Sequence, residues 1–347
     1  MNRRNLSAAF IILGLAAAGF TQTVSFKVAG VTRNLILHAP SGTNKPALVY
    51  VLHGYNIDAT MMQNTTYMDR VADREKFIVV YPNAINKSWD MSDASHDYEF
   101  LLAIIDTMEA RYHIDRNRVY VSGFSQGGFL CFALACKYAD IFAAIAPVSG
   151  LFNTTPCNPK RPVPTKMTFG TADVATPASF MQTVAKWVDI LGCPTEPVVT
   201  RPYPPSNPNS VVTRLEYAPC KEGAEFVVDS VRGGTHEWVI DTKTKISNSD
   251  EIWAFFKKFS LHTTATLPRT ASVGACNRIT ASYCGGMVRL RGAGENCRVR
   301  VTDTKGSLAA TFYAPDHAFV FKDRPSGVYF ITVSVKSGPA TIKMIIP

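Results

Sequence analysis

Short, fully apolar runs alternate with longer helical stretches from Arg33 to Leu261, and this alternation limits the fold more than any other feature. Strands are expected at residues 48–52, 77–81, 118–122, 143–148, 166–169 and 226–231, and helices at 60–75, 97–112, 127–138, 178–191 and 249–259. Strands that are apolar on both sides suit a parallel sheet with helices on both faces. Because such crossovers are right-handed, the sequence predicts an open, doubly wound α/β sheet over residues 24–260.

The C-terminal part of the chain has a different character. Residues 261–273 are rich in Thr and Ala and are expected to form a linker. Beyond them, short strand-like runs are separated by Gly, Asp and Pro without a helical pattern: 288–290, 298–301, 319–321 and 328–335. Regularly spaced short strands of this kind predict a small β-sandwich domain over residues 274–347.

The N-terminus has the pattern of an export signal. Arg3 and Arg4 precede an apolar stretch over residues 8–20 that ends in small residues. A basic start, a short apolar run and a small-residue zone are typical of a secretory signal peptide, here residues 1–23. A membrane anchor is the alternative, for which the run is short. We therefore expect a secreted or cell-surface protein.

Export would allow the eight cysteines to pair. Cys193 and Cys220 flank a Pro-rich loop and are the best candidates for one bridge. Cys131 and Cys136 share one predicted helix, five positions apart and so on different faces, and are expected to be buried thiols. One further bridge is expected among three cysteines near the C-terminus: Cys276, Cys284 and Cys297.

The formal net charge of +9 is unevenly distributed along the chain. Residues 24–267 hold 23 basic and 23 acidic residues, whereas residues 268–347 hold 11 basic and 4 acidic ones. The large domain is therefore neutral, and we expect no nucleic-acid partner. A basic tail can mark attachment to an acidic surface, but a merely soluble face is the favoured interpretation.

A nucleophile motif joins an expected strand to an expected helix. Gly123-Phe-Ser125-Gln-Gly127 has the pattern G-x-S-x-G, and Gly128 follows it. In a strand–turn–helix context the turn is so tight that the flanking positions must be glycine, and the serine oxygen stands clear of the backbone. The alternative is a Gly-rich turn that lets a helix pack closely on a sheet. Ser125 is the predicted nucleophile.

A serine hydroxyl needs a base to take its proton. Of the seven histidines, only His236 follows an expected strand and lies in a loop with two glycines. The acid should lie between serine and histidine in chain order, and Asp173 comes just after the strand that ends at Phe169. Asp173 would hold the imidazole in the correct tautomer, although it could instead cap a helix. Asp189, on a helix, and Asp229, inside a strand, are weaker candidates.

Gly54 ends an early strand and lets backbone amides face the site. The amides of Tyr55 and Gln126 are expected to bind the oxyanion of a tetrahedral intermediate. His53 is interpreted as a structural residue whose ring bonds loop backbone. No Cys/His spacing resembles a zinc site, and neither a metal nor an organic cofactor is expected.

The chain resembles the secreted polyhydroxybutyrate depolymerase and feruloyl esterase family over residues 25–260, in the segments 52–54, 77–82, 97–100, 118–128, 142–150, 169–173, 187–193, 233–236 and 252–256 and at Trp89. The resemblance implies an α/β-hydrolase fold, the triad Ser125, Asp173 and His236, and oxyanion amides at Tyr55 and Gln126.

Two departures bear on the substrate. Polymer depolymerases of the family usually have Cys after the early His-Gly pair, where this chain has Tyr55, and the context of Trp89 also differs. Both favour a plant cell-wall ester, such as feruloyl or acetyl groups on xylan. Trp89 and Trp238 are candidates to line the substrate pocket, of which Trp89 is the one predicted, and a packing role is the alternative for either. A polyester depolymerase is the alternative. The alternative from another class is a non-catalytic surface protein that uses this fold for binding.

The tail is similar to the C-terminal sorting domains of type IX secretion, in the segments 299–303, 305–306, 325–333 and 343–346. This resemblance implies a sorting or attachment role at the cell surface. A carbohydrate-binding module is the alternative, against which stands the absence of tryptophan after Trp253.

Overall fold

The computed structural model describes residues 20–241 and 245–261 and, further along the chain, the strands between residues 280 and 346. The chain divides into two compact units, Met1–Ala265 and Thr266–Pro347. Of the predicted signal peptide only residues 20–23 are described, and they begin the first strand. The predicted linker lies outside the described residues except for Leu261.

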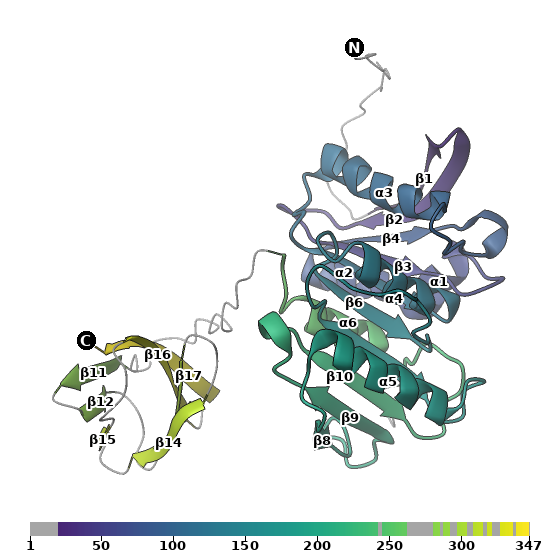
Figure 1. The fold of residues 1–347 in the computed structure, drawn as a ribbon. Helices are drawn as coiled ribbons and strands as arrows, with labels where there is room; N and C mark the ends of the chain where they lie inside the picture. Colours follow the sequence, from purple (N-terminus) through teal and green to yellow (C-terminus); the bar gives the residue numbers. More distant parts are fainter. Residues whose placement is uncertain are drawn as a thin grey trace. The chain divides into compact units, whose positions relative to one another are not determined.

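The first unit is built on one ten-stranded sheet with the order β1-β2-β4-β3-β5-β6-β7-β10-β9-β8 (Figure 1). Its strands are β1 (Phe20–Val28), β2 (Val31–Ala39), β3 (Leu48–Leu52), β4 (Ile78–Pro82), β5 (Val119–Phe124), β6 (Ala144–Val148), β7 (Thr165–Gly170), β8 (Val198–Thr200), β9 (Val212–Tyr217) and β10 (Phe226–Val231). The six strands from β4 to β10 along that order are parallel. The predicted doubly wound, mostly parallel sheet is confirmed.

Helices cover both faces of this sheet. They are α1 (Ala59–Thr66), α2 (Met68–Glu75), α3 (His96–Tyr112), α4 (Gln126–Lys137), α5 (Pro177–Leu191) and α6 (Asn248–Phe256). Helices α3, α4 and α5 contribute to one apolar core and α1, α2 and α6 to the other. Every residue of β3 is buried, with Tyr50 in the first core and Val49 and Val51 in the second. A strand buried on both faces must be apolar throughout, which explains the runs in the sequence.

Two predicted helices have different bounds in the structure. The helix expected over residues 60–75 is two helices, because Tyr67 adopts φ 52 and ends α1 before α2 begins. The helix expected over residues 249–259 ends at Phe256. The other predicted strands and helices of the large unit agree with the structure to within two residues at each end.

Two disulfides are present among the described side chains. The predicted Cys193–Cys220 bridge is confirmed. The prediction for Cys136 is wrong: it bonds Cys157 in the loop between β6 and β7. Cys136 lies in the last turn of α4, where that loop passes, whereas Cys131 points toward the sheet and is a buried free thiol, as predicted. The bridge expected near the C-terminus lies outside the described side chains.

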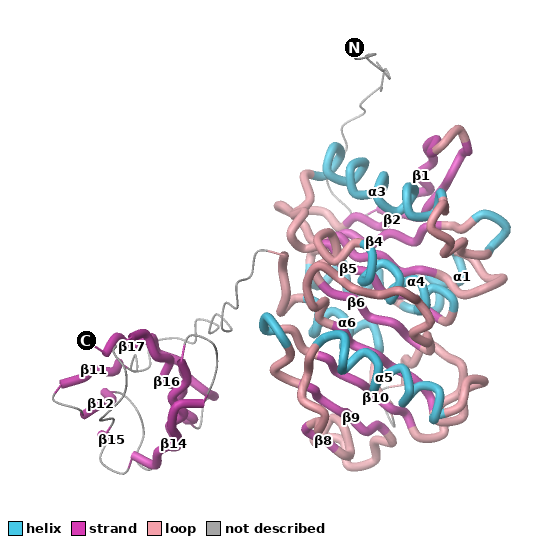
Figure 2. The backbone as a smooth tube through the Cα atoms, in the orientation of Figure 1, coloured by secondary structure: helices cyan, strands magenta, loops and turns pink. Residues whose placement is uncertain are grey.

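The second unit contains two antiparallel sheets (Figure 2). One has the order β11 (Thr280–Cys284), β12 (Met287–Arg291), β15 (Ala318–Val320). The other has the order β14 (Leu308–Ala314), β13 (Cys297–Asp303), β16 (Gly327–Val335), β17 (Gly338–Ile346). The described residues of this unit form no helix, and each of the four predicted strand runs overlaps an observed strand.

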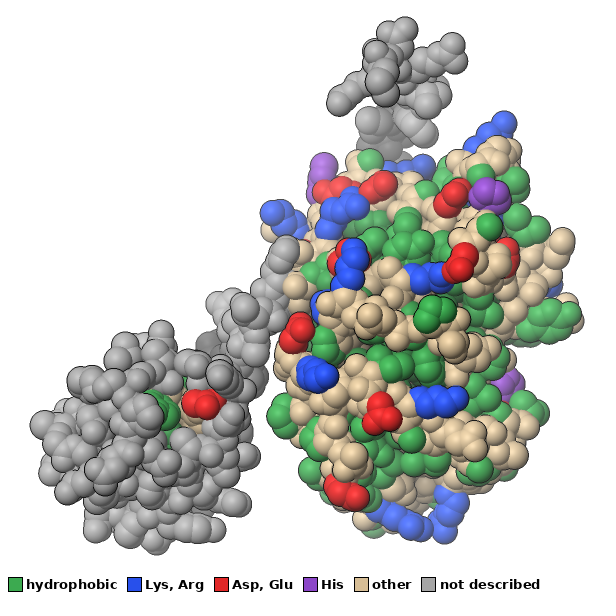
Figure 3. Space-filling view, viewed as in Figure 1, with side chains coloured by type: hydrophobic (Ala, Val, Ile, Leu, Met, Phe, Trp, Pro, Cys, Tyr) green, Lys and Arg blue, Asp and Glu red, His purple; other side chains and the backbone are tan. Residues whose placement is uncertain are grey.

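Charges of both signs are interspersed over the face of the large unit drawn in Figure 3. Surface ion pairs such as Lys160–Asp140 and Arg116–Asp106 join charges of opposite sign on the large unit. Helices long and apolar enough to cross a bilayer are absent from the part of the chain that the structure describes.

Candidate active site

Ser125 occupies a tight turn between β5 and α4. It is the single residue between these elements and adopts φ 53 and ψ −116. A Cβ on Gly123 would lie 2.4 Å from the Gly127 carbonyl, and a Cβ on Gly127 would lie 2.5 Å from the carbonyl oxygen of Leu52. Both glycines are therefore needed for the turn to close, as the motif predicts. Ser125 is held at its backbone, where its N–H donates to the Val148 carbonyl at 2.9 Å.

The loop that follows β3 runs directly against this serine. A Cβ on Gly54 would lie 3.2 Å from the Ser125 Cβ. Among the described residues, no side chain or backbone group is hydrogen-bonded to Ser125 Oγ. The hydrogen bond between a catalytic serine and its histidine is often long in structures without substrate, and it tightens only when substrate binds.

His236 and Asp173 are joined by a hydrogen bond. His236 Nδ1 lies 2.8 Å from Asp173 Oδ1, with the aspartate side chain fully buried and the histidine side chain 29% exposed. Asp173 Oδ1 also accepts from the Ala175 N–H at 3.1 Å. A carboxylate at Nδ1 favours the proton on that nitrogen, which leaves Nε2 as an acceptor. Asp173 Oδ2 is buried and has no partner among the described residues.

Backbone contacts fix the two loops that carry this pair. They follow the parallel neighbours β7 and β10, so they emerge at the same edge of the sheet. The Ala172 N–H donates to the Gly234 carbonyl at 2.8 Å. A Cβ on Gly170 would lie 2.1 Å from the same carbonyl oxygen, so the backbones touch there. The His236 ring lies 4.7 Å from the ring of Phe124, the residue before Ser125. The structure therefore brings Ser125, Asp173 and His236 to one place.

The amides of Tyr55 and Gln126 flank the same serine. Gln126 is the first residue of α4, and the first N–H groups of a helix have no partner within it. Tyr55 follows Gly54, and its side chain is 69% exposed. Within the described ranges, neither amide donates a hydrogen bond to another protein group.

His53 is fully buried behind this loop. Its Nε2 accepts from the Ala84 N–H at 3.0 Å, and its Nδ1 lies 2.7 Å from the Gly54 carbonyl. An amide N–H on Nε2 requires the proton on Nδ1, so the ring is neutral. Burial lowers the pKa of His53, which agrees with this state. The predicted structural role of His53 is confirmed by these bonds.

Trp89 lies beside His53, with the rings 4.8 Å apart. It is 3% exposed. Its Nε1 donates to the His53 carbonyl at 2.8 Å, and its backbone N–H donates to Gln126 Oε1 at 3.0 Å. Gln126 Nε2 in turn donates to Ser88 Oγ at 3.1 Å. The structure thus places Trp89 at the site through contacts with protein groups, and its predicted contact with substrate stays a prediction.

The sequence analysis missed a buried ion pair that supports this region. Arg33 Nη2 lies 2.5 Å from Asp97 Oδ1, with both side chains almost fully buried. Asp97 Oδ2 accepts from the Asp90 N–H at 2.8 Å, and Arg33 donates to the Asn83 carbonyl at 3.2 Å. The pair therefore holds both ends of the segment that contains Trp89. Partners this far apart in the chain leave no local pattern.

Asp229, the weaker candidate for the triad acid, belongs to a buried charge cluster. Its carboxylate bonds Lys166 Nζ and accepts two hydrogen bonds of 2.7 Å from Arg214. Arg214 also contacts Glu251 of α6 at 2.7 Å. Burial opposes ionisation of Asp229, but the charges of Lys166 and Arg214 lower its pKa below the ordinary value. The cluster ties β7, β9, β10 and α6 together, so Asp229 is already engaged.

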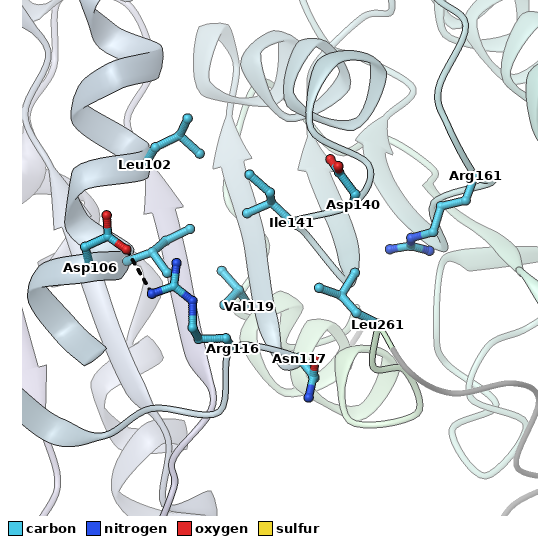
Figure 4. Close-up of a pocket in the computed structure, with 10 residues that line it drawn as sticks. Leu102, Asp106, Arg116, Asn117, Val119, Asp140, Ile141, Arg161 and Leu261 are labelled. Carbon is cyan, nitrogen blue, oxygen red and sulfur yellow. Dashed lines mark hydrogen bonds and ion pairs between the residues drawn. The ribbon is translucent and has the colours of Figure 1, made fainter. Parts of the chain in front are cut away.

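A cavity of about 620 Å³ lies elsewhere in the large unit (Figure 4). Its wall includes the Arg116–Asp106 ion pair, Arg161 and Leu261. It also includes Val119, which begins β5, whereas Ser125 follows the end of that strand. The cavity therefore lies at the opposite end of the parallel strands from Ser125. Among the described residues, no three His, Cys, Asp or Glu side chains are placed to hold a metal ion.

Comparison with known proteins agrees with this geometry. Residues 32–157 match the family described as Esterase PHB depolymerase. A bifunctional acetylxylan esterase/xylanase of Neocallimastix patriciarum is 30% identical over 263 residues, covering 71% of this chain and 38% of that protein. A feruloyl esterase D of Neurospora crassa is 31% identical over 189 residues, covering 53% of this chain and 62% of that protein. The chain thus spans less than two thirds of either relative.

The solved structure of an acetyl xylan esterase from Aspergillus awamori is similar in fold. It aligns with a TM-score of 0.55 and 16% identity, covering 69% of this chain and 99% of that one. The likeness shows that the large unit has the α/β-hydrolase fold.

Proposed function

We propose that the protein is a serine carboxylic-ester hydrolase with Ser125 as nucleophile, His236 as general base and Asp173 as the residue that orients the histidine. The observation that carries the proposal is the 2.8 Å bond from His236 Nδ1 to the buried Asp173, beside a serine on a strained turn. A strained backbone at a serine between a strand and a helix is a feature of catalytic turns.

The reaction is acyl transfer in two steps. Ser125 Oγ attacks the ester carbonyl while His236 Nε2 takes the hydroxyl proton, and the imidazolium then protonates the departing alcohol. Water next attacks the acyl-enzyme, gives a proton to His236, and the acid leaves as the proton returns to Ser125. The amides of Tyr55 and Gln126 bind the oxyanion in both steps, and one such donor is worth roughly 3 kcal/mol.

The substrate we propose is an ester on plant cell-wall polysaccharide, a feruloyl or acetyl group on xylan. The relatives that are named acetylxylan esterase and feruloyl esterase support this class. The family description supports the alternative, polyhydroxybutyrate or another polyester.

We propose further that the protein is exported. The two disulfides support an oxidising compartment, since such bridges are rare in the cytosol. Residues 274–347 would fold as a β-sandwich that sorts or attaches the enzyme at the cell surface. The two antiparallel sheets described there support this assignment.

Ester hydrolysis by the exported chain and by its Ser125→Ala variant tests the function. The panel holds methyl ferulate, acetylated xylan, p-nitrophenyl acetate and polyhydroxybutyrate, and a fluorophosphonate probe reports on the serine. Serine-dependent activity on the ferulate or xylan substrates supports the proposal in full. Clearing of the polymer instead moves the substrate to a polyester and keeps the mechanism. A folded protein that the probe does not label, and that hydrolyses none of the four, is a binding protein and not an esterase.

A further inference from the structure

We propose that Trp89 is a positioning residue that holds the two oxyanion amides in their mutual geometry, an inference that rests on the function proposed above. The two amides belong to different parts of the chain. Tyr55 lies in the loop after β3, and Gln126 begins α4 after β5. Trp89 belongs to a third segment, after β4, and is bonded to both sides.

On one side, Trp89 fixes the loop of Tyr55. Its Nε1–H donates to the carbonyl of His53, two residues before Tyr55. The ring of His53 is itself held by the Ala84 N–H and bonds the Gly54 carbonyl. The peptide groups that lead to the Tyr55 amide are therefore fixed by hydrogen bonds from buried partners. Without the indole N–H, the buried His53 carbonyl would lose its partner, and the loop would move to satisfy it.

On the other side, Trp89 fixes Gln126. The backbone N–H of Trp89 donates to Gln126 Oε1, and Ser88 Oγ accepts from Gln126 Nε2. The side chain of Gln126 therefore faces the segment 88–89 and not the substrate. Gln126, which supplies one oxyanion amide, is thereby hydrogen-bonded to Trp89, which orients the loop that supplies the other.

The burial of Trp89 separates this role from a substrate contact. A residue that is 3% exposed has almost no surface to offer an acyl group. A positioning residue affects every ester alike, because all tetrahedral intermediates carry the same oxyanion. A pocket residue affects esters according to the size of their acyl group.

The experiment compares Trp89→Phe with Trp187→Phe in the full-length exported chain. Trp187 is a matched control, because it is fully buried and its Nε1 donates at 2.9 Å to Thr165 Oγ1, away from the site. Removing an oxyanion donor costs about 100- to 1000-fold in kcat, so displacing one should cost roughly 10- to 100-fold. We expect this loss in kcat per serine titrated by fluorophosphonate, with KM changed less than about twofold.

Two further measurements sharpen the test. The loss should be the same for p-nitrophenyl acetate and for methyl ferulate. Affinity for phenylboronic acid, which forms a tetrahedral adduct on the serine, should fall by a similar factor. Gln126→Met keeps the backbone amide but removes the three hydrogen bonds of the side chain to Ser88 and Trp89, so it should reproduce the pattern if Trp89→Phe is too unstable to assay.

The outcomes separate this inference from the proposed function. If Trp89→Phe raises KM for methyl ferulate alone, Trp89 is a pocket residue and the inference is overturned. Equal kcat values for Trp89→Phe and Trp187→Phe overturn it as well, while Ser125-dependent activity of the parent protein leaves the esterase standing. Failure of the proposed function is recognised separately: in that case the probe does not label Ser125 of the parent protein, and Ser125→Ala changes no activity.

Discussion

Ser125 carries a backbone strain that can be measured by comparing two variants, Ser125→Ala and Ser125→Gly. Both remove the hydroxyl, so both should be inactive. Only the alanine variant keeps a Cβ at φ 53 and ψ −116, a conformation that costs a non-glycine residue about 1–3 kcal/mol. Glycine loses this strain but adds about 0.4–1 kcal/mol of chain entropy to the unfolded state. We therefore expect the glycine variant to be more stable than the alanine variant by about 1–2 kcal/mol.

Tryptophan fluorescence during urea unfolding is a suitable assay. All four tryptophans lie in the described part of the large unit, so the signal reports on that unit alone: Trp89, Trp187, Trp238 and Trp253. If the same fluorescence is followed during heating, each kcal/mol of this difference should shift the Tm of a unit of this size by about 2–4 °C. A glycine variant that is less stable than the alanine variant would refute the reasoning, since that is the order expected where the backbone is unstrained.

The remaining predictions concern parts of the large unit that support the site. Asp229→Asn should lower the free energy of unfolding in the same assay by about 3–5 kcal/mol, because it leaves the buried Lys166 without its counter-charge while Arg214 keeps only Glu251. Lys166→Met should cost less, since Asp229 keeps its bidentate arginine, and the reverse order would contradict this account of the cluster. Replacing Cys136 and Cys157 together by serine should cost about 3 kcal/mol, and dithiothreitol should destabilise the parent protein more than the variant, which keeps only the Cys193–Cys220 bridge among the two described. Because burial lowers the pKa of His53 in the folded protein, the unfolded chain binds a proton on this imidazole more readily than the folded protein does at pH values below the ordinary pKa of 6.5. Stability should therefore fall as pH drops through that range. A His53→Gln variant that shows the same decline as the parent protein would count against this cause.

The central sheet could be predicted because its strands are buried on both faces. The segment 48–52 is apolar at every position, and the structure buries all five residues of β3. The edges of the sheet give a weaker signal. In β1 only Val24 is buried, and β8 has no buried residue, so their sequences do not differ clearly from loops. Strands β1 and β8, the outermost strands of the sheet, were therefore missed.

The break at Tyr67 was missed for another reason. Helical periodicity continues across it, and only the left-handed backbone of this one residue separates α1 from α2. A non-glycine residue in that conformation is selected by packing and leaves little trace in the sequence. The pairing of Cys136 was missed because its partner lies in an irregular loop.

The predicted triad depended on constraints that act on the backbone and so appear as local patterns. Gly123 and Gly127 flank Ser125 because their backbones lie too close for a side chain, and Gly170 touches Gly234 for the same reason. Each of these glycines belongs to a short motif that can be recognised without knowledge of the fold. Where two segments of the backbone approach this closely, glycine is required, and each segment carries it in its sequence.

Side-chain partners distant in the chain leave no such mark. Arg33 meets Asp97 and Trp89 meets His53 through bonds that any of several residue pairs could make at those positions. A tryptophan before an aspartate is compatible with a substrate pocket and with a buried support, and only the burial of Trp89 and its hydrogen bonds to His53 and Gln126 favour the second. Candidate reacting groups of a site of this kind can thus be proposed from sequence, whereas the residues that support their geometry must be found in the fold.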